Sequence, residues 1–454
     1  METPVVRFVK EYNNSRKTRF HMPGHKGHVF FGCEPYDITE IPGADVLHHG
    51  NGILAESQKN ASALFGSGAT HYSTEGSSHC IKAMLAILKM EQGKSRQDKP
   101  FLLAARNVHR SMVDACALLD LGIHFIMPEK QESLCSAVIS KGFLEKAIAE
   151  CKKKPLGVYV TSPDYLGQMA DIASLSVVCK KHGLPLLVDN AHGAYLHFLK
   201  APLHPLDLGA AMCCDSAHKT LPALTGAAYL HIHKEYAGRF EPYAAQALAI
   251  FGSTSPSYLL LQSLDLCNQY LSGEYPDKLG RVVAKVGAIK KELAGRGICV
   301  KPSEPLKIVL DTAQNGYRGG EIAKEMRSFA IECEYADRQN VVLMAAPENT
   351  ETDWERLSQW AAETKLVREK KEAFPCKPFP ALQTEQVMGI REAAFSKHEA
   401  LPVYDAVGRV CAAETVSCPP AVPIAVCGEL ITKEMAELFL QYGIEEVSVC
   451  VRDY

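Results

Sequence analysis

A lysine and an aspartate in this chain have the types and spacing that an aldehyde cofactor requires. Lys219 lies in the segment SAHKT (216–220), directly after an apolar run that ends in CCD (213–215). Thirty residues upstream, LLVD (186–189) has the pattern of a buried strand that ends in the carboxylate of Asp189. With pyridoxal phosphate, a lysine amine forms a Schiff base and a buried carboxylate keeps the pyridine nitrogen protonated. Alone, each residue is more often a surface charge or a turn former, but the pair predicts a cofactor site.

A second segment has the composition of a phosphate-binding turn. Gly76, Ser77 and Ser78 precede a helix-like run over residues 81–90. Backbone N–H groups and hydroxyls at a helix N-terminus, together with the helix dipole, attract anions. An ordinary serine cap has the same pattern. The presence of Lys219 in the same predicted domain favours the phosphate.

Two histidines follow predicted strand ends. His109, in RNVHRS (106–111), could stack on a flat cofactor ring, although most loop histidines are solvated. His192 lies three residues after Asp189 and faces the same predicted crevice. Because the ordinary pKa of histidine is near neutrality, His192 could hydrogen-bond the cofactor or the substrate carboxylate, or transfer protons.

Three further histidines lie close together near the N-terminus, at His21, His25 and His28. A metal site is one reading of this spacing. Histidines at positions i and i+4 chelate well on a helix, but the proline and glycines of residues 21–28 disfavour a helix. We therefore expect a loop that closes over a neighbouring site, and no metal.

Apolar runs alternate with helical patterns from about residue 60 to residue 260. The predicted strands include Phe101–Ala105, Gly157–Thr161 and Leu186–Asp189. Such alternation predicts βαβ units and a mainly parallel sheet that is buried on both faces. Ligands bind beyond the carboxyl ends of the strands of such sheets, which is where the polar residues above lie.

The rest of the chain reads as two further units. A long helix is predicted over Glu274–Arg296, and strands at Lys307–Asp311 and Val341–Met344 flank a helix over Gly320–Phe329. Another helix is predicted over Thr352–Lys370. The proline-rich stretch 373–380 predicts a rigid, non-helical connector.

Bulk composition limits the class of protein. The chain has 454 residues, 47% of them hydrophobic and 22% charged, with a net charge of -3, which is ordinary for a globular protein of two to four domains. The charge balance argues against a nucleic-acid partner. The 16 cysteines are scattered and predict reduced thiols rather than a disulfide framework. With no signal peptide pattern and no bilayer-length apolar run, we expect a cytoplasmic protein without a membrane partner.

Several segments together resemble the pyridoxal-phosphate-dependent ornithine/lysine/arginine decarboxylase family. They are FHMPGHKG (20–27), RNVHRS (106–111), SPDYLGQMADI (162–172), DNAHGAY (189–195), SAHKTLPALTG (216–226), STSPSY (253–258) and GRVCAAETVSCPPAVPIAVCGE (408–429). The resemblance implies an α/β chain of the aspartate-aminotransferase-like fold in its short form, without an N-terminal wing domain. The expected parts are an arm (1–60), a large cofactor-binding domain with a mainly parallel sheet (61–295), a small α/β domain (296–372) and a C-terminal α+β domain (373–454).

The resemblance also implies roles for individual residues. Lys219 would hold the cofactor, Asp189 would pair with its ring nitrogen, and His109 would stack on the ring. The phosphate and its surroundings would be held by Gly76, Ser77, Ser78, Ser216 and His218, with His192 close by. Ser253 or Thr254 would reach the phosphate of a partner subunit, because family active sites lie at a homodimer interface. The dimers could pair into larger assemblies.

Four positions depart from the family pattern. Glu75 stands where an asparagine is usual, and a carboxylate near a phosphate is unfavourable unless it points away. Cys80 replaces a common glycine, and Cys418 replaces a common aromatic residue. The strand-end motif reads Asp-Asn-Ala-His instead of Asp-Glu-Ala-His, which places an amide at Asn190.

The expected reaction is the α-decarboxylation of a basic amino acid, either arginine, lysine or ornithine, to the corresponding amine and carbon dioxide. Catalytic roles are expected for Lys219, Asp189 and His192. Two alternatives stay open at this point. One is another reaction on the same fold, such as transamination or elimination, and the other is a degraded, cofactor-binding regulatory subunit.

Overall fold

The computed structural model describes residues 1–93, 99–128, 133–369, 371–373, 379, 382, 385–415 and 420–451. The chain divides into two compact units. The first comprises Met1–Leu103, Glu145–Val160 and Asp171–Asp277, and the second comprises Ala104–Leu144, Thr161–Ala170 and Lys278–Tyr454. Most of the predicted proline-rich connector, and Cys418, lie outside the described residues. None of the described helices is long and apolar enough to cross a membrane.

The larger sheet has seven strands in the order β1-β7-β6-β5-β4-β2-β3. Their bounds are β1 Ala69–Ser73, β2 Phe101–Ala105, β3 Gly122–Ile126, β4 Val158–Thr161, β5 Leu186–Asp189, β6 Met212–Asp215 and β7 Ala228–Ile232. β5 and β6 are parallel, with Asp189 opposite Cys214, whereas β7 is antiparallel to β6 and β1. The predicted α/β class with a mainly parallel sheet is confirmed.

Continuous apolar runs explain the central strands. Every residue of β2, β5, β6 and β7 is buried, as expected for strands covered on both faces. Helix α3 packs against β6 and β7. The helices from the N-terminus to the end of α9 are α1 Pro4–Asn14, α2 Ile53–Leu64, α3 Gly76–Gln92, α4 Arg110–Leu119, α5 Lys141–Glu150, α6 Ile172–Lys181, α7 Ala217–Thr220, α8 Ala237–Phe251 and α9 Tyr258–Leu271. The short helical turns η1 Glu34–Tyr36, η2 Ala194–Phe198 and η3 Lys234–Tyr236 complete it.

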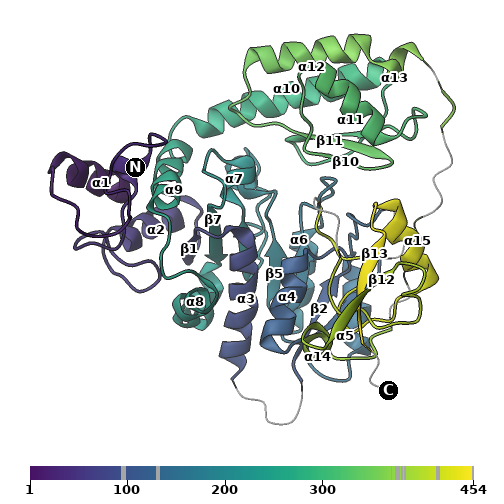
Figure 1. The fold of residues 1–454 in the computed structure, drawn as a ribbon, viewed down its shortest axis with the longest axis horizontal. Coiled ribbons are helices and arrows are strands. Elements are labelled where there is room, and N and C mark those ends of the chain that lie inside the picture. Colours follow the sequence, from purple (N-terminus) through teal and green to yellow (C-terminus); the bar gives the residue numbers. More distant parts are fainter. Residues whose placement is uncertain are drawn as a thin grey trace. The chain divides into compact units, whose positions relative to one another are not determined.

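The small domain has a four-stranded sheet in the order β10-β11-β9-β8. Its strands are β8 Val300–Lys301, β9 Lys307–Asp311, β10 Tyr335–Ala336 and β11 Asn340–Met344, and its helices are α10 Tyr275–Gly295, α11 Gly319–Ser328, α12 Glu351–Glu363 and α13 Lys365–Arg368. In Figure 1 the three longer helices lie on the same side of β10 and β11.

The predicted helix over residues 352–370 is two helices. Thr364 separates them, because its extended backbone ends α12 and its hydroxyl accepts a hydrogen bond from the Leu366 N–H at 3.3 Å, which caps α13. The side chain of a threonine competes with the backbone for such bonds, so it favours a helix start over a helix interior.

The C-terminal domain joins α14 Ile390–Ala394 and α15 Lys433–Gln441 to the two-stranded sheet of β12 His398–Pro402 and β13 Glu446–Cys450. Its core includes Val403, Ile431, Phe439 and Val449. The pairs of the four-stranded sheet are all antiparallel, and the predicted bounds of the four parts stay predictions.

The cysteines of the described residues are free thiols. Most of them are buried, including Cys80, Cys213 and Cys214, and Cys33 is exposed. Burial raises the pKa of these core thiols above the ordinary value, so they stay protonated.

A buried carboxylate attaches the N-terminal helix to the first unit. Asp265 in α9 is 1% exposed. Its Oδ2 accepts the N–H groups of Val5 and Val6 at 3.0 and 3.1 Å, and its Oδ1 accepts the hydroxyl of Ser57 at 2.5 Å. It thereby satisfies two of the N–H groups that the start of α1 leaves open.

We predict that Asp265→Ala lowers the free energy of unfolding by about 3 kcal/mol, because buried donors lose their acceptor. Urea unfolding would measure the loss, and limited proteolysis would show whether α1 is released first. Asp265→Asn keeps one acceptor oxygen and should lose less stability. An alanine variant as stable as the unchanged protein would contradict this role.

Candidate active site

Lys219 lies in the short helix α7, which directly follows β6. Its Nζ is 3.1 Å from Nε2 of His192, which follows the end of β5. The lysine is half-buried, and His192 is 5% exposed. Two residues that the sequence places 27 positions apart are therefore in hydrogen-bond contact, as required for proton exchange between amine and imidazole.

Asp189 ends β5 and is 3% exposed. Its Oδ1 accepts the N–H of Ala191 at 3.1 Å and the thiol of Cys214 at 3.7 Å. This carboxylate belongs to the same strand end as His192. Asp189 and Lys219 thus occupy adjacent parallel strand ends, as their spacing predicted.

The predicted phosphate turn forms the N-terminus of α3, a helix of 17 residues. Gly76 begins the helix with φ of 73°, a conformation that favours glycine. The Ser216 hydroxyl, from the start of α7, donates to the Ser77 hydroxyl at 2.8 Å. Hydroxyls from two elements therefore meet at the positive end of a long helix, beside Ser78, and this donor set fits a phosphate group.

Glu75, the residue directly before this turn, is bound by another segment of the chain. Its Oε1 accepts the backbone N–H of Ser253 at 2.6 Å. The donor comes from a segment 178 residues away and partly offsets the charge of this carboxylate. Thr254, the next residue, is exposed.

His218 is oriented toward the backbone of the same unit. Its Nδ1 donates to the carbonyl of Ala227 at 3.1 Å. Burial lowers the pKa of His218 below its ordinary value, and the charge of Lys219 adds to this effect. The ring is therefore neutral at pH 7 and fixes the connection between α7 and β7.

His109 belongs to the second unit, where it caps α4. Its Nδ1 accepts the N–H of Ser111 at 3.1 Å, so a neutral His109 carries its ring hydrogen on Nε2. The preceding Arg106 is fully buried and donates to the carbonyls of Pro423 and Ile424 at 3.1 and 2.8 Å. Two family-like segments, 106–111 and 408–429, thus pack together.

An ion pair completes this contact. Arg106 Nη2 lies 3.2 Å from Oε2 of Glu429, and both side chains are almost wholly buried. Burial raises the pKa of Glu429, whereas the guanidinium of Arg106 lowers it. Removing one partner would leave a buried unpaired charge, so the pair holds the C-terminal segment to the loop that carries His109.

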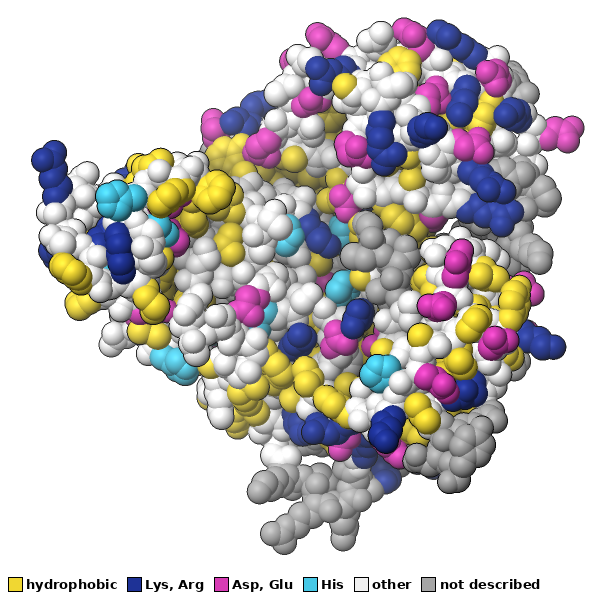
Figure 2. Space-filling model, in the orientation of Figure 1, with side chains coloured by type: hydrophobic (Ala, Val, Ile, Leu, Met, Phe, Trp, Pro, Cys, Tyr) yellow, Lys and Arg dark blue, Asp and Glu magenta, His cyan; other side chains and the backbone are white. Residues whose placement is uncertain are grey.

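The N-terminal histidines do not share one site. His21 contacts the Tyr12 hydroxyl at 2.6 Å, whereas His25 contacts Asp37 at 3.2 Å. Hydrophobic side chains gather on this arm, at the left of Figure 2, and Phe20 and Phe31 are more than nine-tenths exposed. Exposed apolar patches of this kind mark interaction surfaces.

A buried cluster that the sequence did not predict lies at the end of β6, around Asp215. Nitrogen atoms of His204 and His231 lie 2.9 and 3.2 Å from Oδ2 of Asp215, and all three residues are fully buried. The residues are far apart in the sequence and carry no recognisable spacing. The pairing of β6 with β7 brings His231 to Asp215, whereas His204 comes from the segment between η2 and β6.

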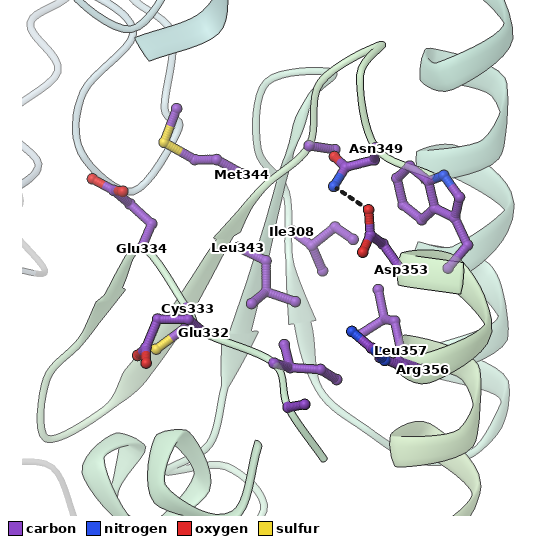
Figure 3. A pocket seen from close by; sticks show the side chains of 14 residues that line it. Ile308, Glu332, Cys333, Glu334, Leu343, Met344, Asn349, Asp353, Arg356 and Leu357 are labelled. Atoms are coloured by element: carbon purple, nitrogen blue, oxygen red, sulfur yellow. Dashed lines mark hydrogen bonds between the residues drawn. The ribbon is translucent and has the colours of Figure 1, made fainter. Parts of the chain in front are cut away.

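A pocket of about 400 Å³ lies in the small domain and contains none of the predicted site residues (Figure 3). Two of its carboxylates are committed elsewhere. Asp353 caps α12 and accepts from Asn349, and Glu332 pairs with Arg327 at 2.9 Å. We assign no chemistry to this pocket.

With this geometry in view, comparisons with known proteins identify the family. A model of the major domain of Orn/Lys/Arg decarboxylases matches residues 3–351. The chain belongs to this family. The Orn/Lys/Arg decarboxylase relationship makes it an amino-acid decarboxylase and confirms the resemblance that its motifs predicted.

Individual relatives extend over most of the chain. An arginine decarboxylase of Bacillus subtilis is 28% identical over 471 residues, covering 95% of this chain and 92% of that protein. One from Halalkalibacterium halodurans is 28% identical over 463 residues, covering 95% and 91%. The crystal structure of a Francisella novicida lysine decarboxylase superposes with a TM-score of 0.78 at 17% identity, covering 98% of this chain and 79% of that one, which supports the fold.

Asp164, in the family-like segment 162–172, supplies a pH test of the second unit. It is 1% exposed, and burial raises the pKa of its carboxyl to about 6. An unfolded aspartate has a pKa of about 3.9, so folding binds a proton between these values. The contribution of Asp164 to stability is therefore greatest below pH 4 and is lost as pH rises through 6.

We predict that Asp164→Asn removes this dependence. The unfolding free energy of the unchanged protein minus that of the variant should fall by about 2 kcal/mol between pH 4 and pH 7. Urea titrations of both proteins at each pH would measure it. A difference that stays constant across this range would contradict the raised pKa.

Proposed function

We propose that this Orn/Lys/Arg decarboxylase uses pyridoxal phosphate to remove the α-carboxylate of a basic amino acid. Arginine is the first substrate to test, because relatives that cover 94–96% of the chain are named arginine decarboxylases. The lysine decarboxylases among the curated relatives match over 60–64% of the chain. Lysine and ornithine complete the panel.

The observation that carries the proposal is the 3.1 Å contact of Lys219 Nζ with His192 Nε2 beside the strand end of Asp189. Only a neutral amine is nucleophilic, and the imidazole is placed to accept its proton. Near-complete burial of His192 and Asp189 excludes water and strengthens each electrostatic interaction.

The donor set fits the cofactor at both ends. Gly76, Ser77, Ser78 and Ser216 would hold the phosphate, and Asp189 would receive the ring N–H. When bound, pyridoxal phosphate supplies an aldehyde that captures amines and a ring that accepts the electrons of the breaking bond. Within that chemistry, Lys219 would attach and release, and His192 would hold or move the proton at Nζ.

Three assignments stay predictions that extend the proposal. His109 would stack on the ring, His218 would support the phosphate side, and Thr254 would serve a partner subunit. The exposed apolar arm supports a homodimer. The cytoplasmic location and the larger assembly also remain predictions.

The reaction can be tested with an amino-acid panel. Purified protein with pyridoxal phosphate should release carbon dioxide and the matching amine from arginine, lysine or ornithine, and not from glutamate. Release of a keto acid instead of an amine would indicate transamination and would contradict the proposal. Absence of turnover with all three basic amino acids would do the same.

Lys219 can be tested directly. Lys219→Ala should lower turnover by roughly 10⁴-fold, because the nucleophile is lost, and should abolish the visible absorbance of the bound cofactor. Lys234→Ala, an exposed lysine of η3 in the same unit, is the matched control and should keep both properties. Full decarboxylation by Lys219→Ala would remove the assigned role.

A further inference from the structure

The fully buried Asp215 is the last residue of β6, four positions before Lys219. Its Oδ2 accepts N–H groups of His204 and His231, and its Oδ1 accepts the side-chain amide of Asn190 at 2.7 Å. Burial alone raises the pKa of a carboxyl, but the two histidines hold that of Asp215 well below its usual range. Asp215 is therefore an ionised acceptor of three hydrogen bonds.

Each donor is fixed by its own surroundings. The Leu206 N–H donates to Nδ1 of His204 at 3.4 Å, so the ring hydrogen of a neutral His204 is on Nε2 and points to Asp215. His231 contacts the Thr70 hydroxyl at 2.8 Å through its other nitrogen. Both rings pack against Phe65, at centroid distances of 5.9 and 4.5 Å.

The pleat of the strands places this network on the face away from the cofactor residues. Successive side chains of a strand point to opposite faces. Cys214 contacts Asp189, whereas the next residue, Asp215, contacts the histidines. In the same way Asp189 faces Cys214, whereas the next residue, Asn190, faces Asp215.

We propose that Asp215 is a positioning residue that binds Asn190 and so joins, from behind the sheet, the two strand ends that carry Asp189 and Lys219. This inference depends on the proposed function in one respect, namely that Asp189 and Lys219 face the cofactor. A backbone bond from the Asn190 N–H to the Cys214 carbonyl at 3.0 Å runs parallel to the side-chain bond. Two bonds therefore set the register of the strand ends.

The departure at position 190 follows from this contact. A glutamate, which the family pattern would place there, cannot donate to a carboxylate and would set two negative charges side by side. The amide of Asn190 supplies the missing donor. The unusual residue in the DNAH segment and the buried Asp215 therefore form a matched pair.

A metal ion is the rival occupant, since ligand atoms of His204, Asp215 and His231 lie within 4.8 Å of one another. The tautomer of His204 argues against it, because the nitrogen that faces Asp215 carries a hydrogen instead of a free lone pair. Metal analysis of the purified protein decides the matter. Stoichiometric zinc that disappears in His204→Gln would overturn the assignment.

A charge swap tests the pair. Asn190→Asp places two carboxylates in contact and should weaken pyridoxal phosphate binding at least tenfold. In the double variant Asn190→Asp/Asp215→Asn, the asparagine oxygen can accept from both histidines and its amide can donate to the new aspartate. The double variant should therefore bind the cofactor within about threefold of the unchanged protein, a coupling that a double-mutant cycle isolates.

Asp265→Asn is the control, because it alters another buried carboxylate of the same unit that binds α1 and α2. It should change the melting temperature and leave the cofactor dissociation constant within twofold. Equilibrium dialysis on folded apoprotein measures that constant. Hydrogen exchange of the amides in residues 216–221 reports on α7, which directly follows the end of β6, and should be at least tenfold faster in Asn190→Asp.

The outcomes separate this proposal from the proposed function. If the unchanged protein does not bind pyridoxal phosphate, the proposed function fails, and the exchange rates of residues 216–221 still test the network in the apoprotein. If Asn190→Asp does not fold, recovery of folded protein in the double variant supports the pairing. A double variant no better than Asn190→Asp in affinity and exchange overturns it.

Discussion

A carboxylate removed from water is stable only where hydrogen-bond donors surround it. In this chain, several buried carboxylates find these donors in segments that are distant in the sequence, and so hold those segments together. Asp265 collects two backbone N–H groups at the start of α1. Glu429 accepts from Arg106 and from the Val426 N–H, within the segment that packs on the loop of His109. In each case one acid joins parts that are distant in the sequence. Removing such an acid would leave its donors unpaired on both sides of the joint.

The strand ends of the large sheet show the same requirement at the candidate site. Asp189 is one residue before Asn190, and the two side chains serve different purposes on opposite faces. One face carries the groups proposed to meet the cofactor. The other face carries the fully buried network around Asp215. The tautomers of its histidines and their packing against Phe65 fix the orientation of the rings. The buried network at the end of β6 thus holds the backbone before Lys219 rigid. This rigidity limits the entropy that is lost when the amine of the lysine is oriented.

Much of the fold follows from local patterns. The bounds of β2, β5 and β9 were predicted correctly, because a buried strand appears in the sequence as a short apolar run between turn residues. The lysine, the aspartate and the serine turn were recognisable because their motifs are contiguous. Thr364 was missed as a helix boundary, since its effect depends on one side-chain hydrogen bond.

The contacts that explain the departures from the family pattern could not be predicted. Glu75 finds its donor 178 residues away at Ser253. Asp215 meets His231 through the pairing of β6 with β7, and it meets His204 through the segment that precedes β6. Nothing in the neighbouring residues of either acid indicates these partners. At Glu75 and Asn190, the departing side chains each make a hydrogen bond that only the folded chain provides.

The free thiols can report which parts of the chain unfold first. A thiol reacts as its thiolate, and burial keeps Cys80, Cys213 and Cys214 both protonated and out of reach. Among the cysteines that the structure describes, Cys33 is exposed in the folded chain and would be alkylated first. The order in which the buried cysteines are alkylated would therefore show the order in which their surroundings unfold.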